Sequence, residues 1–182
     1  MNEEENFIKS EEKVILVDKN DKEIGIGEKL QTHKKGELHR AFSVFVFNSK
    51  DELLLQKRAK SKYHSGGLWT NTCCSHPKPG ELIEKTIHRR LKEEMGFDCN
   101  LKQIFNFYYK EKLDNIFFEH EWDYIFFGKF DGEPMPNPEE VDDWKWISLE
   151  ELKKDMLKNS GNYTAWLKIL IDKVIYYFKL GF

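Results

Sequence analysis

The sequence predicts one domain of mixed α/β class, an α+β arrangement in which a β-sheet is sandwiched between helices. Three observations predict it. The chain has 182 residues, the size of one domain that buries roughly 70% of its unfolded surface. Apolar runs of strand length fill most of the chain, and one amphipathic helix interrupts them. Helical patterns close the chain. This order is typical of a mixed sheet covered by helices.

The first third of the chain predicts strands joined by polar turns. Residues 1–12 hold five glutamates and are expected to be an acidic leader before a single domain at 13–182. Residues 24–40 are polar and glycine-punctuated, which predicts a short strand followed by a loop. Apolar runs bounded by turn residues predict strands at 13–18, 42–47 and 52–57, the last two joined by a turn at 48–51.

The clearest helix is expected at 81–96, where Gly96 ends the pattern. Its apolar residues recur every four positions, at Ile83, Ile87, Leu91 and Met95. The preceding segment, 58–80, shows no periodicity and contains two prolines and three glycines. A long irregular segment inside a compact domain is usually functional.

The rest of the chain predicts two strands and two helices. Aromatic-rich strands are expected at 102–110 and 119–130, and a proline-rich acidic loop at 132–143. A capping box at 148–151 opens a short helix that ends near Lys158. A closing helix is expected at 163–180, with one apolar face formed by Trp166, Leu167, Leu170 and Val174.

Composition excludes several classes of protein. Lys and Arg number 29 against 32 Asp and Glu, and the net charge of −3 does not suggest a nucleic-acid binder. No apolar run approaches the roughly 18 residues of a membrane span, and the acidic first residues do not form a signal peptide. Three cysteines cannot build a disulfide framework. We therefore expect a cytoplasmic protein with neither nucleic acid nor a membrane as partner.

Cysteine, histidine and glutamate side chains are candidates for metal chemistry. Cys74 and His76 lie in the irregular segment. The cysteine could belong to a metal site, be a reactive thiol, or be a small side chain buried in the core. Two glutamates spaced two apart on a strand share a face and repel each other unless a cation or proton lies between them; a solvated strand face is the alternative. The set that suits octahedral Mg²⁺ or Mn²⁺ with one position open is His33, His39, His76, Glu119 and Glu121.

Basic side chains near these elements are candidates for phosphate binding. Arg90 and Glu94 lie four apart on the expected helix, where they form either a solvated ion pair or part of a Mg²⁺ site. Arg binds phosphate oxygens in a bidentate manner and Lys acts as a point charge. Ordinary surface charge is the alternative for the four candidates, Lys29, Arg58, Lys62 and Arg90.

A longer motif links these residues. Residues 68–77 read L-W-T-N-T-C-C-S-H-P, which matches the pattern W-T-N-x-x-C-x-H-P with Cys74 at the cysteine position. Four other segments match in the same order, at 28–43, 58–62, 89–96 and 119–121. In these segments the chain resembles the type I isopentenyl-diphosphate Δ-isomerases, a branch of the Nudix superfamily. It departs from the general Nudix box at Ser75 and at Arg90, which replaces a glutamate that hydrolytic members use as a metal ligand.

The resemblance implies a Nudix fold and an isomerase of isoprenoid biosynthesis. Such an enzyme interconverts isopentenyl diphosphate and dimethylallyl diphosphate through a tertiary carbocation. The resemblance implies that Glu121 donates a proton, that Cys74 is its partner at the opposite face, and that the roles exchange with direction. Tyr109 would help the proton transfer of Glu121, and the ring of Trp166 would stabilise the cation.

The resemblance also implies two cation sites. One divalent cation, Mg²⁺, Mn²⁺ or Zn²⁺, would be bound by His33, His39, His76, Glu119 and Glu121. A second Mg²⁺, held through Glu94, would bridge to the substrate diphosphate. The remaining charge of this small-molecule substrate would be bound by Lys29, Arg58, Lys62 and Arg90.

Two other functions compete with this one. A Nudix pyrophosphohydrolase predicts Glu rather than Arg at position 90 and has no use for Cys74. A non-catalytic Nudix module that binds a phosphorylated metabolite predicts an incomplete set of metal ligands, whereas all five are present. No feature of the sequence indicates the oligomeric state.

Overall fold

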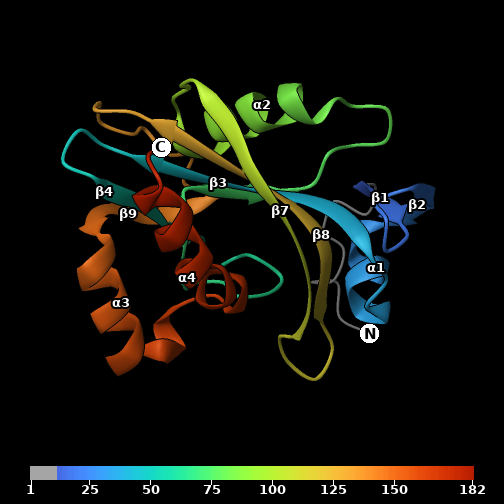
Figure 1. Cartoon of the computed structure of the whole chain (residues 1–182). Helices are drawn as coiled ribbons and strands as arrows, with labels where there is room; N and C mark the ends of the chain where they lie inside the picture. Colours follow the sequence, from blue (N-terminus) through green and yellow to red (C-terminus); the bar gives the residue numbers. More distant parts are fainter. Residues whose placement is uncertain (1–11) are drawn as a thin grey trace.

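One mixed β-sheet forms the middle layer of the molecule, and helices cover both of its faces (Figure 1). The computed structural model describes residues 12–182, so nearly all of the predicted leader at 1–12 lies outside the described residues. The sheet contains nine strands. The predicted sandwich of a mixed sheet between helices is therefore confirmed.

The longest strands form the centre of the sheet. The central strand β3 (His39–Phe47) pairs in parallel with β8 (Phe118–Lys129) along its whole length. On its far side β8 pairs antiparallel with β7 (Leu101–Lys112). These three strands carry His39, Glu121 and Tyr109 of the site described below.

Shorter strands complete the sheet around β3 and β4. Strand β3 also pairs antiparallel, at successive points, with β1 (Lys13–Val17), β6 (Cys73–Ser75) and β4 (Glu52–Arg58). Strand β2 (Glu23–Glu28) lies beside β1, and β4 also pairs with β5 (Trp69–Thr70) and β9 (Val141–Ser148).

Two apolar cores lie on opposite faces of the sheet because side chains alternate along each strand. Phe42, Val44 and Val46 of β3 pack toward α2 (Ile83–Met95). The intervening Phe45 and Phe47 belong to the core on the α4 side. That face is covered by α3 (Leu149–Lys158), the short 3₁₀ turn η2 (Ser160–Asn162) and α4 (Ala165–Lys179).

The predicted helices are confirmed within a few residues. In α2, Ile87, Leu91 and Met95 are buried as the four-residue period predicts. Gly96 ends the helix with a positive φ of 74°, a conformation that glycine adopts without steric cost, and its N–H donates to Lys92 O. The apolar face predicted for the closing helix is buried in α4.

One helix forms where the sequence predicted a loop. Residues 24–40 contain β2, as expected, but also α1 (Lys29–Lys35). Three basic side chains lie in its last turn, where they complement the helix dipole. Gly36 then ends it with a φ of 64°. The prediction was wrong because seven residues are too few to show a helical period above the polar background.

Three strands were missed: the short β5 and β6 lie in the segment 58–80, which was expected to be irregular, and β9 lies mostly outside any predicted element. Residues 132–143 were predicted as a loop, yet β9 begins at Val141 and runs to Ser148. The acidic residues at the start of β9 made the segment look polar, so the apolar positions that follow were not recognised as a strand. Trp144 and Trp146 pack against the core beneath α2, while Ile147 packs against the other core. Tertiary packing thus makes this segment a strand despite its polar beginning.

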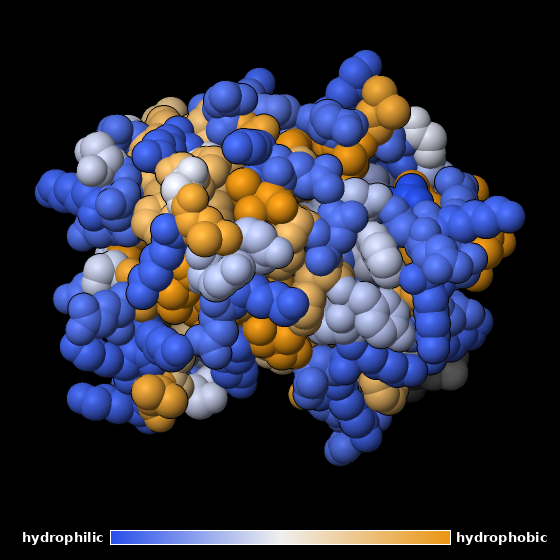
Figure 2. All heavy atoms as spheres, in the orientation of Figure 1, coloured by the Kyte–Doolittle hydropathy of each residue, from blue (hydrophilic) through white to orange (hydrophobic). Residues whose placement is uncertain are grey.

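The surface is mostly hydrophilic, with a few apolar side chains gathered over α4 and the adjacent β7 on the face drawn in Figure 2. Phe105 of β7 stacks on Tyr177 of α4 there, with ring centroids 4.6 Å apart. No helix among residues 12–182 is both long and apolar enough to cross a membrane.

Candidate functional site

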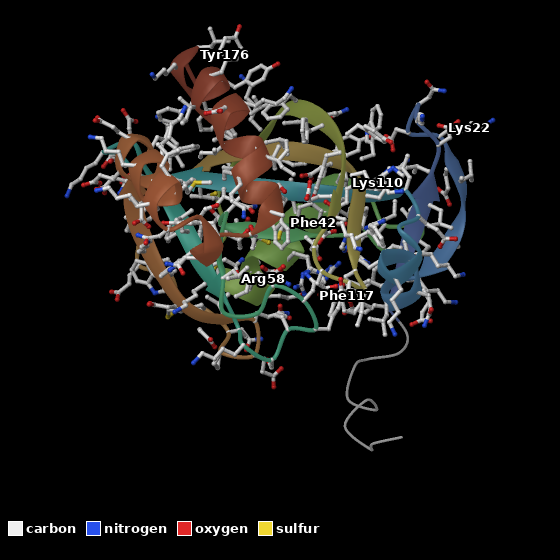
Figure 3. The ribbon with its side chains drawn as sticks, turned by 90° about the horizontal axis from the view of Figure 1, so that it is seen from below. Lys22, Phe42, Arg58, Lys110, Phe117 and Tyr176 are labelled. Carbon is white, nitrogen blue, oxygen red and sulfur yellow. The ribbon has the colours of Figure 1, made fainter. Side chains whose placement is uncertain are left out.

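A cleft of about 640 Å³, its open mouth included, lies where β3, β4, β6 and β8 approach α2 and α4. Its wall contains every predicted site residue except His33 and His39, which are fully buried. Figure 3 shows Phe42 and Arg58 of this wall toward the middle of the molecule, with Lys22 and Tyr176 at its edges. The structure therefore gathers residues that lie far apart in the sequence.

Strand register explains why the central residues meet. In the parallel pair, His39 of β3 is the direct neighbour of Glu121 of β8. On the other side of β8, the antiparallel register places Tyr109 opposite the same glutamate. Directly paired residues point to the same face of a sheet. Tyr109 Oη accordingly donates a hydrogen bond of 2.6 Å to Glu121 Oε2.

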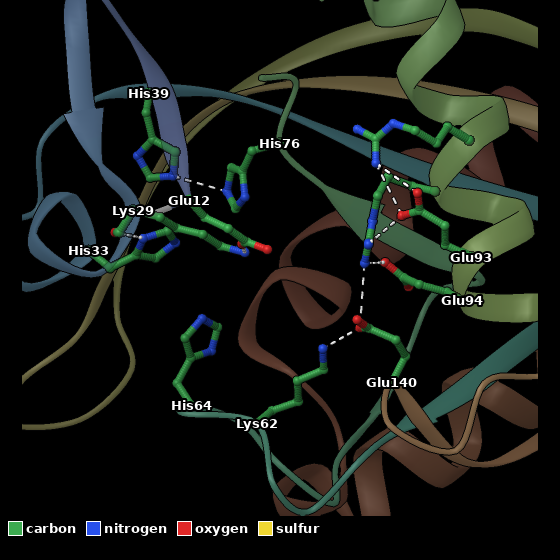
Figure 4. A network of polar contacts seen from close by, with 12 residues as sticks. Glu12, Lys29, His33, His39, Lys62, His64, His76, Glu93, Glu94 and Glu140 are labelled. Carbon is green, nitrogen blue, oxygen red and sulfur yellow. Dashed lines mark hydrogen bonds and ion pairs between the residues drawn. The ribbon is translucent and has the colours of Figure 1, made fainter. Parts of the chain in front are cut away.

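Four side chains converge on one point beside Glu121. The ligand atoms of His33, His39, His76 and Glu121 all lie within 4.8 Å of one another. His76 Nε2 lies 3.0 Å from Glu121 Oε1 and 3.2 Å from His39 Nε2. Figure 4 shows the three imidazoles facing one another from α1, β3 and the end of β6. Each histidine alone could have been a surface residue, but His33 and His39 are fully buried.

Backbone contacts fix which nitrogen of two histidines faces this point. His33 Nδ1 donates to Lys29 O at 2.7 Å, and His39 Nδ1 donates to Glu37 O at 2.9 Å. A carbonyl only accepts, so each Nδ1 carries a proton and Nε2 is the nitrogen of each ring that faces this point. This arrangement is typical of metal-binding histidines, whose second nitrogen is held by a carbonyl or carboxylate.

Two buried atoms without partners test whether a cation fits. His33 Nε2 and Glu119 Oε2 are buried, form no hydrogen bond with any of residues 12–182 and lie 3.4 Å apart. Buried polar atoms are normally satisfied, so this pair fits ligands of a cation. Glu119 lies outside the group of four and shares His33 with His64 in a second group. The structure therefore brings four of the five predicted ligands together, and Glu119 reaches them through its contact with His33.

Burial and charge separate the pKa values of the ligands. Burial lowers the pKa of His76 to about 3, so its imidazole is neutral at pH 7, the form that binds metals. Burial, reinforced by the charge of Glu121, raises the pKa of Glu119. Although burial opposes it, contacts with His39 and His76 lower the pKa of Glu121. Glu121 is therefore the more readily ionised carboxyl.

A thiol and an indole line the same cleft. Cys74, in β6, pairs with Ser43 of β3, and burial raises the pKa of its thiol, which keeps it protonated at pH 7. Trp166, at the start of α4, donates from Nε1 to Asn71 Oδ1 at 3.2 Å. Arg58 lies over this indole, 5.3 Å from the ring centroid. The cleft thus combines a proton-bearing thiol with an aromatic wall.

The basic residues lie together, and three of the four are paired with acids. Lys29 Nζ lies 2.7 Å from Glu12 Oε2, and Lys62 contacts Glu140. Arg90 bonds Glu94 at 2.6 Å and approaches Glu140 at 3.4 Å (Figure 4). By contrast, Arg58 forms no ion pair within residues 12–182, and its Nε is buried without a hydrogen-bond partner.

Glu94 is held at both oxygens. Arg90 donates to Oε1, and Gln56 of β4 donates to Oε2 at 2.8 Å. Arg90 stands where the general Nudix box has glutamate, and this ion pair fills the space beside Glu94. The ion pair that was one of the two alternatives for Arg90 and Glu94 is thus present, at a buried carboxylate rather than on a solvated face.

Sequence reasoning missed several residues of the cleft. His64 lies in the irregular segment, beside Glu119, and burial together with Arg58 lowers its pKa. Glu140 lies in the segment predicted to be a proline-rich loop. Gln56 lies on the strand predicted at 52–57, to which no site residue was assigned. Four of the six histidines of the chain contact this site, and their abundance near the irregular segment was the available signal for His64.

Comparison with known proteins places these features in a family. The model of the NUDIX domain matches residues 37–167. The chain is 53% identical to "Isopentenyl-diphosphate Delta-isomerase 1" of Aromatoleum aromaticum over 91% of this chain and 93% of that protein. It is 48% identical to the "Isopentenyl-diphosphate Delta-isomerase" of Pectobacterium atrosepticum, over 88% of this chain and 90% of that protein.

Solved structures support the fold alone. A crystal structure from Deinococcus radiodurans superposes with a TM-score of 0.76 at 17% identity, covering 89% of this chain and 98% of that one. A MutT protein from Methanosarcina mazei gives a TM-score of 0.60 at 18% identity, covering 75% and 91%. The predicted Nudix fold is thus confirmed, and the chain belongs to the isopentenyl-diphosphate Delta-isomerases of the Nudix superfamily.

Proposed function

We propose that this chain interconverts isopentenyl diphosphate and dimethylallyl diphosphate. One observation carries the proposal: Glu121 joins the imidazole group through one oxygen and Tyr109 through the other, in the same cleft as the Cys74 thiol. Relatives with this activity in their names are 48% to 53% identical to the chain. The cleft offers proton donors and acceptors around a basic patch, which is what this isomerisation needs.

The reaction moves a double bond by adding one proton and removing another. Protonation of the terminal CH₂ carbon of the double bond leaves a tertiary cation on the adjacent carbon. Loss of a proton from the chain CH₂ group attached to that cationic carbon forms the new double bond. The substrate and product are isomers, so no other atom is gained or lost. The site therefore needs two proton-exchanging groups and must exclude loose water.

Glu121 and Cys74 are the groups that we propose for these two transfers. Glu121 gives the proton to the double bond and Cys74 takes the second proton, and the roles exchange when the reaction runs in the other direction. The protonated thiol and the low pKa of Glu121 suit the direction in which Cys74 is the donor. Tyr109 keeps its phenolic proton, because burial beside Glu121 raises its pKa, and holds Glu121 Oε2 by donating to it.

Trp166 is the residue that we propose faces the cation. Its indole lines the cleft and is held by the bond from Nε1 to Asn71. The face of an aromatic ring attracts a nearby cation by about 2 kcal/mol or more when water is excluded. A fixed indole thus favours the carbocation over the neutral substrate.

The imidazole group is the proposed site of a divalent cation. His33, His39, His76, Glu119 and Glu121 would hold it, and nitrogen with oxygen ligands suits Zn²⁺, Mn²⁺ or Mg²⁺. When bound, the cation would supply fixed positive charge that tunes the acidity of Glu121. Its placement is supported by the orphaned His33 Nε2 and Glu119 Oε2.

The basic patch is the proposed site of the diphosphate. Arg58 is free of carboxylate partners in the described chain, whereas Lys29, Lys62 and Arg90 would exchange their acids for phosphate oxygens or share them. Glu94 would hold a second Mg²⁺, which would supply positive charge to offset that of the diphosphate; Glu94 Oε1 is bonded to Arg90 in this structure.

Product analysis separates this function from its alternatives. Purified protein with isopentenyl diphosphate and Mg²⁺ should form the allylic diphosphate without release of phosphate. Phosphate release would instead indicate a pyrophosphohydrolase, which the presence of Arg90 disfavours. Binding without turnover would indicate a non-catalytic module. Variants Cys74→Ala and Glu121→Gln should each lose isomerisation by about 10²-fold or more, and full activity in either would contradict the assigned roles.

A further inference from the structure

His64 is a buried imidazole beside the proposed cation site that the five ligands do not include. It lies between β4 and β5, lines the cleft and is 8% exposed. Figure 4 shows it facing His33 from the side opposite His39 and His76. A histidine buried this deeply beside carboxylates needs a partner for its N–H.

The ring of His64 is fixed by packing. It stacks near His33, with centroids 5.6 Å apart and an interplanar angle of 29°. The rings of Tyr63 and Trp166 meet it edge-on at 4.4 Å and 6.0 Å. Its Nδ1 lies 3.4 Å from Ser65 Oγ, a hydroxyl that can donate to it. The N–H is then at Nε2, which points to Glu119.

The two oxygens of Glu119 face different imidazoles. Oε2 lies 3.4 Å from His33 Nε2 and has no hydrogen-bond partner in the part of the chain that the structure describes. Oε1 lies 3.5 Å from His64 Nε2. That distance is about 0.5 Å longer than a full N–H···O hydrogen bond, so a small rotation of the carboxylate closes it. One oxygen is thus left for a cation and the other for His64.

A separate metal site at His64 is disfavoured by the chemistry of His33. The ligand atoms of His33, His64 and Glu119 lie within 4.8 Å of one another. However, His33 Nδ1 is used by the carbonyl of Lys29. Its single free nitrogen belongs to the group with His39, His76 and Glu121, and one lone pair binds one cation. His64 and Glu119 alone would make a weak site.

We propose that His64 is a positioning residue: its Nε2–H donates to Glu119 Oε1 and turns Oε2 toward the cation shared with His33. This inference rests on the cation site proposed above. Groups that orient metal ligands in this way typically contribute 10- to 100-fold to metal affinity or activity. His64 would therefore determine how firmly Glu119, the ligand at the margin of the group, joins the others.

Manganese binding to the full chain tests the proposal without an activity assay. Mn²⁺ is titrated into the wild type, His64→Leu, His64→Ala and His64→Gln, with free Mn²⁺ measured by electron paramagnetic resonance. The two variants without a donor should bind Mn²⁺ about 10- to 100-fold more weakly. His64→Gln places an amide N–H near the position of Nε2 and should recover most of the affinity. His88→Leu, which removes a histidine from the outer side of α2, is the matched control.

Electron spin echo modulation then counts the imidazole nitrogens bound to Mn²⁺. Three bound imidazole nitrogens in both the wild type and His64→Leu support the positioning role. Four in the wild type and three in His64→Leu would make His64 a direct ligand and overturn the proposal. If the wild type binds Mn²⁺ and both His64→Leu and His64→Ala bind it with the same affinity, the role of His64 is overturned and the cation site is retained. Wild type that binds no Mn²⁺ overturns the cation site and this inference together. Unfolding temperatures measured in the presence of a chelator show whether each variant is folded. If His64→Leu does not fold, His64→Ala and His64→Gln provide the same comparison.

Discussion

Glu121 is the residue at which the proposed cation chemistry and proton chemistry meet. Its Oε1 lies 3.0 Å from His76 Nε2 and 3.6 Å from His39 Nε2. Its Oε2 accepts from Tyr109 at 2.6 Å. Because the two oxygens have separate partners, the two contributions can be tested by separate substitutions.

Tyr109→Phe removes only the hydroxyl that holds Glu121 Oε2. We expect kcat for isomerisation to fall by about 10²-fold, the lower end for a group that assists proton transfer. The ring packing is kept, so the unfolding temperature should change little. Tyr108→Phe is the matched control, because its hydroxyl contacts His120 on the opposite side of the strand. Equal kinetics of the two variants would remove Tyr109 from the account.

Arg58→Gln removes a guanidinium that has no carboxylate partner in the described chain. Hydrogen bonds to charged groups contribute about 1.5–3 kcal/mol, so we expect KM for isopentenyl diphosphate to rise by about 10- to 100-fold with a smaller change in kcat. Lys57→Gln, on the neighbouring position of β4, should leave KM unchanged. Initial rates over a range of substrate concentrations decide between these outcomes.

At the scale of elements, α2 is tied to the segment before it by an ion pair. Glu81 was predicted in the first turn, but the helix begins at Ile83 and Glu81 instead accepts two bonds of 2.8 Å from Arg89. These bonds lower the pKa of Glu81 to about 2. The pair holds the end of the cysteine-bearing segment against the helix that carries Glu94.

Glu81→Gln should destabilise the protein by about 1 kcal/mol at pH 7, the upper range for a surface pair. The pKa of Glu81 is lower in the folded than in the unfolded state, so its contribution is complete above pH 4.5 and is lost as the pH falls toward 2. Urea unfolding should thus show a difference from wild type that is constant from pH 7 to 5 and shrinks below. Glu84→Gln, at an exposed first-turn residue, should show no such trend, and a matching trend there would refute the assignment.

Elements with a strong local pattern could be predicted, and those made by tertiary packing could not. The stripe through Ile87 and Leu91 and the turn at 48–51 are local features, and α2 and the β3–β4 hairpin follow them. By contrast, α1 is too short to show a period, and β9 takes its structure from pairing with β4 and from the burial of Trp144.

The candidate site followed the same division. The residue types came from motifs, but their convergence depends on the parallel register that places His39 beside Glu121, which no local pattern encodes. His64 and Glu140 lie in segments without periodicity, so only the folded chain shows that they enter the cleft. The motifs thus predicted which residue types take part, whereas their relative positions follow from the strand register of the sheet.

At the scale of the whole molecule, one sheet joins two cores and holds the cleft at its end. Leu91 of α2 and Leu167 of α4 are fully buried in different cores. Leu91→Ala and Leu167→Ala should each cost about 2–5 kcal/mol of unfolding free energy. Because both cores share β3, urea unfolding should remain one transition by circular dichroism and by tryptophan fluorescence. Two separated transitions would show that the cores unfold independently.

The most direct test of the central claim is isomerisation in deuterium oxide. Isopentenyl diphosphate is incubated with the purified protein and Mg²⁺ in D₂O, and the product is examined by mass spectrometry and nuclear magnetic resonance. Protonation by one group and deprotonation by another predict dimethylallyl diphosphate with deuterium on the carbon that was the terminal CH₂. Allylic product without deuterium, or phosphate release in its place, would contradict the account.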